Sequence, residues 1–256
     1  MAFDYVSVDE AIARGGLRMV VVGNVPSLWG EAAKGILHVK RLDWAAVRLV
    51  YDNDALKTWA GQRSGPVLVY GKEPPLSNWQ DILLLAERLA PLPALLPDDG
   101  AGREFVLVLS ADICSAGGLG WSRRLQLVHA GLRGDNGFPE RVAKYLAAKY
   151  GYDPQAGDSH GVRVAELLGK LANRLREQHA VGSRYYCGNR LSALDIYSAA
   201  AIGMFSPLPS VQCAMDPAMR AAFESRDASV AAALDPVLIE HRDMVYAEHL
   251  ELPLSL

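Results

Sequence analysis

Every strand-like run in this sequence lies before residue 76, whereas the patterns beyond residue 102 are all helical. The apolar, β-rich run at residues 17–22 ends at a glycine and a proline, and residues 27–39 then repeat apolar side chains at helical spacing. A second strand is predicted over residues 45–51. A β-α-β unit of this length favours two parallel strands joined by the helix.

The next segment continues the mixed α/β pattern. Residues 65–70 predict a third strand that opens with Pro66, and residues 71–75 predict a turn with at most a poor edge strand. Residues 79–90 then form a clear amphipathic pattern. The stretch PLPALLPDDGAG combines prolines, acids and glycines without periodicity, which is typical of a linker between domains.

The remainder of the chain contains only helical patterns. The pattern over residues 192–205 is apolar nearly all round and predicts a central buried helix. The six predicted helices span residues 103–116, 121–132, 139–150, 161–179, 192–205 and 236–249.

Composition narrows the class of protein. The 256 residues are half apolar and carry a formal charge of −3, with no basic stripe that could follow a row of phosphates, so we expect no nucleic-acid partner. An acidic start and the lack of a long apolar run predict no signal peptide and no membrane span, and hence a cytoplasmic protein.

Cysteine and histidine usage points away from metal and disulfide chemistry. The three cysteines, Cys114, Cys187 and Cys213, lie far apart, and the six histidines have no ligand-like spacing. We therefore expect no metal site, and we interpret the cysteines as small buried hydrophobic residues.

Three motifs occur in a specific order. They are Pro26-Ser27-Leu28-Trp29 at the start of the first helix, Gly65-Pro66-Val67-Leu68 at the third strand, and GNRLSALDI at residues 188–196. With these motifs the sequence resembles the glutathione S-transferase family over nearly its whole length. More narrowly, it resembles a divergent, bacterial-like member of the cytosolic type with a serine-type active site.

The resemblance implies a fold and a domain division. The fold is an α/β thioredoxin-like N-terminal domain followed by an all-α C-terminal domain. Residues 1–92 would form the glutathione-binding domain, with residues 1–16 as an N-terminal extension, residues 93–102 as the linker and residues 103–256 as the helical domain. The family also implies a homodimer, and glutathione as co-substrate without a metal.

Ser27 is the catalytic candidate that the resemblance indicates. A hydroxyl that donates to the glutathione sulfur, and the positive end of a helix, both favour the thiolate that the chemistry requires. The alternative is an ordinary helix-capping serine, which would stabilise the fold by about 1 kcal/mol and take no part in chemistry.

Glutathione-binding residues are implied around the third strand and the following helix. By resemblance Pro66 is a cis-proline, and Gly65 pairs its backbone with the cysteinyl part of glutathione. The remaining candidates are Gln62, Arg63, Ser77 and Asn78. Relatives carry an acid followed by serine at the start of this helix, and here the acid is missing. The helix N-terminus can still receive a carboxylate, with Ser77 and Asn78 as polar contributors. The alternative is that both residues serve only as helix caps.

A second, apolar pocket between the domains is expected to take the other substrate. Trp29, Trp121 and Arg124 are its candidates, with Arg123 beside them, and the arginines would favour an anionic acceptor. The first hypothesis is an enzyme that joins the glutathione thiolate to a small electrophile. The alternative is a non-catalytic module that keeps the fold to bind a ligand or protein. Thiol-disulfide exchange is disfavoured, because serine replaces the nucleophilic cysteine.

Overall fold

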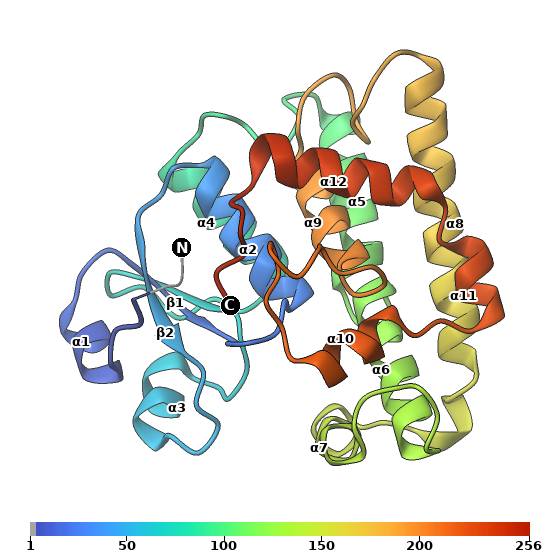
Figure 1. Ribbon diagram of the computed structural model, residues 1–256. Coiled ribbons are helices and arrows are strands. Elements are labelled where there is room, and N and C mark those ends of the chain that lie inside the picture. Colours follow the sequence, from blue (N-terminus) through green and yellow to red (C-terminus); the bar gives the residue numbers. More distant parts are fainter. Residues whose placement is uncertain (1–3) are drawn as a thin grey trace.

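The first part of the chain folds around a small mixed sheet. The computed structural model describes residues 4–256 and places this sheet beside a larger helical half (Figure 1). Strand β1 (Leu17–Val21) lies in the centre, parallel to β2 (Trp44–Arg48) and antiparallel to β3 (Val67–Tyr70). Helix α2 (Leu28–Val39) joins the parallel pair. The predicted β-α-β unit and third strand are thus confirmed, and the predicted poor edge strand is a single bridge between Leu68 and Leu76.

Helices cover both faces of the sheet because successive side chains of β1 point to opposite sides. Met19 and Val21 pack in one apolar cluster with α2 and with α4 (Trp79–Leu89). Val20 packs on the other face with α1 (Val8–Ala13) and α3 (Asp54–Ala60). All five residues of β1 are buried, as this two-sided cover requires.

Helix α1 lies in the segment that the sequence treats as an N-terminal extension. Ser7 and Glu10 form a capping box at its start, and Val6 pairs with Val47 at the edge of β2. No pattern predicted this six-residue helix. A helix this short gains most of its stability from packing, which sequence periodicity does not report.

The later part of the described chain is helical. None of the described residues after position 76 lies in a strand or bridge. All six predicted helices are present, with ends within a few residues of those expected. Two further short helices, α10 and α11, were missed because six to eight residues give too little periodicity. The elements are α5 (Gly100–Cys114), α6 (Leu119–Leu132), α7 (Glu140–Tyr150), the 3-10 turn η1 (Pro154–Ala156), α8 (Ser159–Ala180), α9 (Ala193–Ile202), α10 (Pro217–Glu224), α11 (Ala228–Ala233) and α12 (Pro236–His249).

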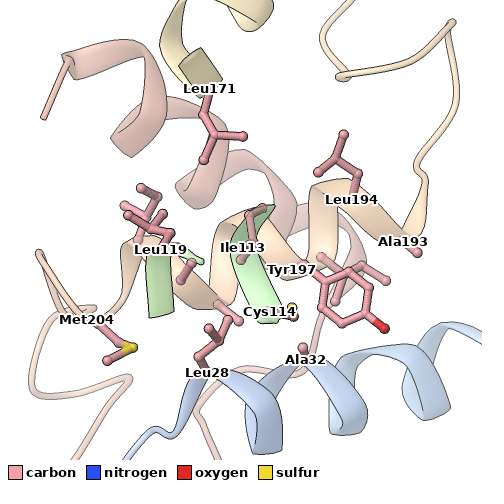
Figure 2. Close-up of a cluster of buried hydrophobic side chains, with 14 of the residues drawn as sticks. Leu28, Ala32, Ile113, Cys114, Leu119, Leu171, Ala193, Leu194, Tyr197 and Met204 are labelled. Atoms are coloured by element: carbon pink, nitrogen blue, oxygen red, sulfur yellow. The ribbon is translucent and has the colours of Figure 1, made fainter. Parts of the chain in front are cut away.

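Helix α9 is the centre of the second domain, as its apolar composition predicts. Every residue of α9 is buried, and the helix packs against α2, α5 and α12. Figure 2 shows Leu28 and Ala32 of α2 facing Cys114 of α5 and Tyr197 of α9. One apolar cluster therefore extends across both domains and fixes the start of α2 against the helical half.

A buried carboxylate organises the start of α9. Asp195 is fully buried and accepts hydrogen bonds from the backbone N–H groups of Tyr186 (3.0 Å) and Ser192 (2.7 Å). It also accepts the Ser192 hydroxyl at 2.6 Å and lies 2.9 Å from His241 Nε2. The capping box that residues 188–196 predict is present, and it holds four groups in one buried network.

One stretch of the described residues is long and apolar enough to cross a membrane by length and composition. It runs from Gly100 to Leu132, and an 18-residue window within it has a mean hydropathy of 1.4, with half of that window buried inside the protein. Residues 115–118 divide it into α5 and α6. Core helices of soluble proteins have the same properties, so this stretch is weak evidence for a membrane span.

Candidate functional site

The loop between β1 and α2 places Ser27 at the start of the helix. Its carbonyl accepts the first helical hydrogen bond, from Glu31 N at 2.7 Å. Its hydroxyl makes no capping bond to the first turn of α2. Ser27 therefore has the backbone position of a helix cap, while its side chain is left without that role.

A cavity of about 160 Å³ opens beside Ser27, between the two domains. The first domain contributes Ser27, Gly65 and Tyr51 to its wall. The second domain contributes Arg124 from α6 and Tyr150 from α7, together with several apolar side chains. The predicted catalytic residue and one predicted glutathione-binding residue thus lie on the same cavity.

Gly65 occupies a confined position ahead of β3. The peptide bond to Pro66 is cis, as the resemblance implied. A side chain at position 65 would place its Cβ 3.3 Å from the Val20 carbonyl and 3.5 Å from Val22 N. The absence of a side chain lets this backbone lie against the end of β1, next to the loop that carries Ser27.

Arg124 lies among aromatic rings in the cavity wall. Its guanidinium carbon is 4.2 Å from the centre of the Trp29 ring and 4.5 Å from that of Tyr150. Among the described residues, no hydrogen-bond acceptor or acidic side chain pairs with it. Burial lowers the pKa of this guanidinium, although an arginine remains a cation at neutral pH.

Arg123, the neighbouring arginine, has a different role. Its side chain is 1% exposed and donates to the carbonyls of Met204, Phe223 and Ser225, and to Gln126. Burial lowers its pKa to about 9. This arginine ties α6 to the segments around α10, so it is a structural residue and does not line the cavity.

The two predicted pocket tryptophans also differ. Trp29 lines the cavity, and its indole N–H donates to the Cys114 carbonyl at 2.8 Å, which fixes the ring. Trp121 does not line the cavity. It packs edge-on against Tyr150, with ring centres 5.3 Å apart, and so supports the wall from behind.

The predicted γ-glutamyl site lies on a separate, much smaller cavity. Ser77 and Pro66 line a space of about 10 Å³ together with Trp79 and Tyr197, which is room for little more than one water molecule. Trp29 lines both cavities. Asn78 caps α4, because its side chain accepts from Gln80 N at 2.8 Å.

Gln62 and Arg63 line neither cavity. Arg63 forms an exposed ion pair with Asp54 at 2.6 Å. Its backbone carbonyl accepts from Lys149 Nζ of α7 at 3.1 Å, a contact that joins the two domains.

Sequence reasoning missed the aromatic and basic side chains of α7 and of the loop after β2. Tyr51 and Lys149 both line the cavity, and the Lys149 ammonium lies 4.9 Å from the Tyr51 ring centre. Tyr145 meets the Tyr51 ring edge-on at 5.4 Å. Tyr145 and Lys149 are four residues apart and so share one helix face, a spacing that could have marked α7 as a cavity wall.

Cysteines and metal-binding side chains add little to this site. Cys114 and Cys213 are buried, Cys187 is half-buried, and burial raises the pKa of each thiol. No group of three histidine, cysteine or acidic side chains that could hold a metal occurs among residues 4–256.

Comparison with known proteins identifies the fold. No protein-family model matches the chain, and no curated protein sequence matches it either. Among solved structures, a glutathione S-transferase domain-containing protein from Marinobacter aquaeolei is similar, with a TM-score of 0.63 and 13% identity over 90% of this chain and 98% of that one.

Two further structures show the same likeness. A glutathione S-transferase from Methylobacterium radiotolerans, in complex with glutathione sulfonate, has a TM-score of 0.59 and 18% identity over 91% of each chain. The β-etherase of a Sphingobium species has a TM-score of 0.57 and 15% identity over 89% of this chain and 99% of that one. This chain therefore has the fold of the glutathione transferases, a thioredoxin-like N-terminal domain followed by an all-helical C-terminal domain.

Proposed function

We propose that this protein is a glutathione transferase in which Ser27 activates the thiol of glutathione. The observation that carries the proposal is the Ser27 hydroxyl, which stands at the N-terminus of a twelve-residue helix, makes no capping bond and lines the interdomain cavity. A serine used only for capping would bind the N–H groups of the first turn instead.

The chemistry follows from the position of this hydroxyl. An unperturbed thiol has a pKa of about 8.5 and is mostly protonated at neutral pH. A hydroxyl donor and the positive end of α2 both stabilise the thiolate and lower that pKa. The thiolate sulfur then forms a bond to an electrophilic carbon. In a halide or an ether the carbon–halogen or carbon–oxygen bond breaks and the leaving group departs with the electron pair, and in an epoxide the ring oxygen keeps that pair and is protonated. In an activated alkene the C=C electron pair moves to the neighbouring carbon, which takes up a proton.

Several electrophiles suit this step, including an alkyl or aryl halide, an ether, an epoxide or an activated alkene. Two of the structural neighbours support the proposal by name, because one is a complex with glutathione sulfonate and another is a β-etherase. A homodimer and a cytoplasmic location, both expected from the sequence, belong to the same proposal.

A non-catalytic binding module is the second candidate. It is favoured by the γ-glutamyl side of the site, where Ser77 lines a cavity too small for a ligand and Asn78 replaces the family's acid. Trp29 separates that side from Ser27. Under this hypothesis the protein keeps the fold without activating a thiol.

The test compares Ser27 with Ser7, another serine at the N-terminus of a helix. Retention on glutathione-agarose and calorimetric titration first show whether glutathione binds. The ultraviolet absorbance of the thiolate is then followed against pH for wild type, Ser27→Ala and the control Ser7→Ala, each saturated with glutathione. Ser7 is a matched control, because it caps α1 on the surface and its hydroxyl accepts from Glu10 N.

The proposal predicts a depressed thiol pKa in wild type and in Ser7→Ala, and a higher one in Ser27→Ala. Equal pKa values in all three proteins would remove Ser27 from the mechanism. Failure to bind glutathione would instead support the non-catalytic module.

A further inference from the structure

Arg124, in the wall of the cavity beside Ser27, has no acidic or hydrogen-bonding partner among the described residues. Other buried or half-buried arginines of the described chain donate their N–H groups to protein acceptors. Arg18 donates to three backbone carbonyls, and Arg242 donates to a carbonyl and to Asp243. Arg124 lies against the rings of Trp29, Trp121 and Tyr150 and makes no hydrogen bond or ion pair among the described residues, so its N–H donors are left for a ligand.

The charge around Arg124 is one-sided. Lys149 lines the same cavity, and none of the described residues that line it is acidic. Lys149 uses one of its donors on the Arg63 carbonyl, while Arg124 uses none on the protein. Two cations and no acid create a positive potential in a half-buried space, where water screens charge less than at the surface.

The rest of the wall is apolar. Phe138, Val142, Leu146 and Met219 line the cavity on the side of the helical domain. Such a surface suits a hydrophobic body, while the few polar groups orient it. Trp29, which stacks on Arg124, follows Ser27 by two residues, so the cation and the hydroxyl belong to one short stretch of wall.

We propose that the electrophile of this protein is an anion, an apolar or aromatic molecule whose carboxylate or similar acidic group binds Arg124 while its reactive carbon faces Ser27. A guanidinium offers paired donors that match a carboxylate, and the aromatic rings hold its plane in place. This inference deepens the proposed function and rests on it for the transfer step, although not for the binding of the anion.

Two synthetic probes, which differ in charge, allow the transfer of the glutathione sulfur to be written out and tested. In 4-chloro-3,5-dinitrobenzoate, the glutathione sulfur forms a bond to the chlorine-bearing carbon, the carbon–chlorine bond breaks, and chloride leaves with the bonding electrons. The thiol proton goes to solvent. The corresponding 4-chloro-3,5-dinitrobenzamide has nearly the same shape and the same reactive carbon but no charge.

The decisive experiment measures binding of both probes by calorimetry in the absence of glutathione. Wild type should bind the benzoate at least about tenfold more tightly than the benzamide, since a charge-assisted pair in a partly buried site is worth that much or more. Arg124→Gln should abolish the preference, and Arg124→Lys should keep part of it. Arg103→Gln, an exposed arginine outside the cavity, should leave it unchanged.

Two further readouts keep the inference open to refutation. If Arg124→Gln fails to fold, Lys149→Gln is expected to reduce the preference without abolishing it. In wild type with glutathione, kcat/KM for the benzoate should exceed that for the benzamide by a similar factor.

Equal binding of the two probes to wild type would overturn the inference. So would an Arg124→Gln variant that binds glutathione less tightly but keeps its benzoate preference, because the cation would then serve a carboxylate of glutathione. Selective benzoate binding without any conjugation would support the anion site and count against the proposed transferase function.

Discussion

Ser27 and Ser192 both stand at the N-termini of helices in this protein, and their surroundings differ. Ser192 precedes α9, is 3% exposed, and donates its hydroxyl to the buried Asp195. Ser27 precedes α2, lies on the interdomain cavity, and makes no capping bond. The same residue at the same kind of position stabilises the fold in one case and, in our proposal, is left for chemistry in the other.

The largest expected effect concerns the buried network around Ser192 and Asp195. Asp195→Ala removes the acceptor of two backbone N–H groups, a hydroxyl and a histidine nitrogen, all within the core. We expect a loss of about 3–5 kcal/mol in the free energy of unfolding, because these groups would remain buried and unpaired. Urea denaturation measures it, with the exposed Asp98→Ala as control. A loss below about 1 kcal/mol would show that the network relaxes or takes up water.

The second-largest effect is expected for Ser27, the serine on the interdomain cavity. Ser27→Ala should reduce conjugation turnover at neutral pH by roughly a hundredfold, the loss typical of one preorganised donor to a reacting anion. The same variant should change the free energy of unfolding by less than about 0.5 kcal/mol, since no capping bond is lost. Steady-state kinetics and urea denaturation on one preparation test both. Normal turnover with lowered stability would make Ser27 an ordinary cap.

A smaller loss is expected for Ser192→Ala. The Asp195 carboxylate keeps its bonds from backbone N–H groups and from His241, so only the hydroxyl contribution disappears. We expect a destabilisation of about 1 kcal/mol, seen as a lower urea midpoint with an unchanged slope. An unaltered midpoint would show that the Ser192 hydroxyl contributes nothing to the network.

The smallest effect concerns Asn78, the cap of α4. Asn78→Asp keeps the oxygen that accepts from Gln80 N and adds a negative charge at the helix N-terminus. We expect about 0.3–1 kcal/mol of added stability at neutral pH. Because the helix end lowers the pKa of this carboxyl in the folded state, the gain is present above its unfolded pKa of about 3.9 and is lost as pH falls through the folded pKa.

Glutathione titration of Asn78→Asp sharpens the comparison further. By the family resemblance, the new carboxylate would meet the ammonium group of glutathione. Tighter binding than in wild type would show that glutathione reaches the start of α4. Unchanged binding would show that Trp29 and Trp79 keep it away from this side.

The sequence by itself determined the order of elements, the two-domain division and the buried core helix. Strand alternation, helical spacing, the proline before β3 and the GNRLSALDI motif act on neighbouring residues, so they can be recognised without knowledge of the tertiary structure. Helices α1, α10 and α11 escaped prediction, because six to eight residues carry too few periodic positions to stand out.

Only the tertiary structure decided what the individual site residues face. Arg123 and Arg124 are adjacent in sequence, yet successive residues point about 100° apart around a helix, so one enters the core and the other the cavity. Likewise Pro66 and Gly65 are neighbours that line different cavities, because Trp29 of α2 stands between these spaces. A sequence lists candidate side chains, but whether a hydroxyl or a guanidinium is left unpaired depends on which distant segments pack against it.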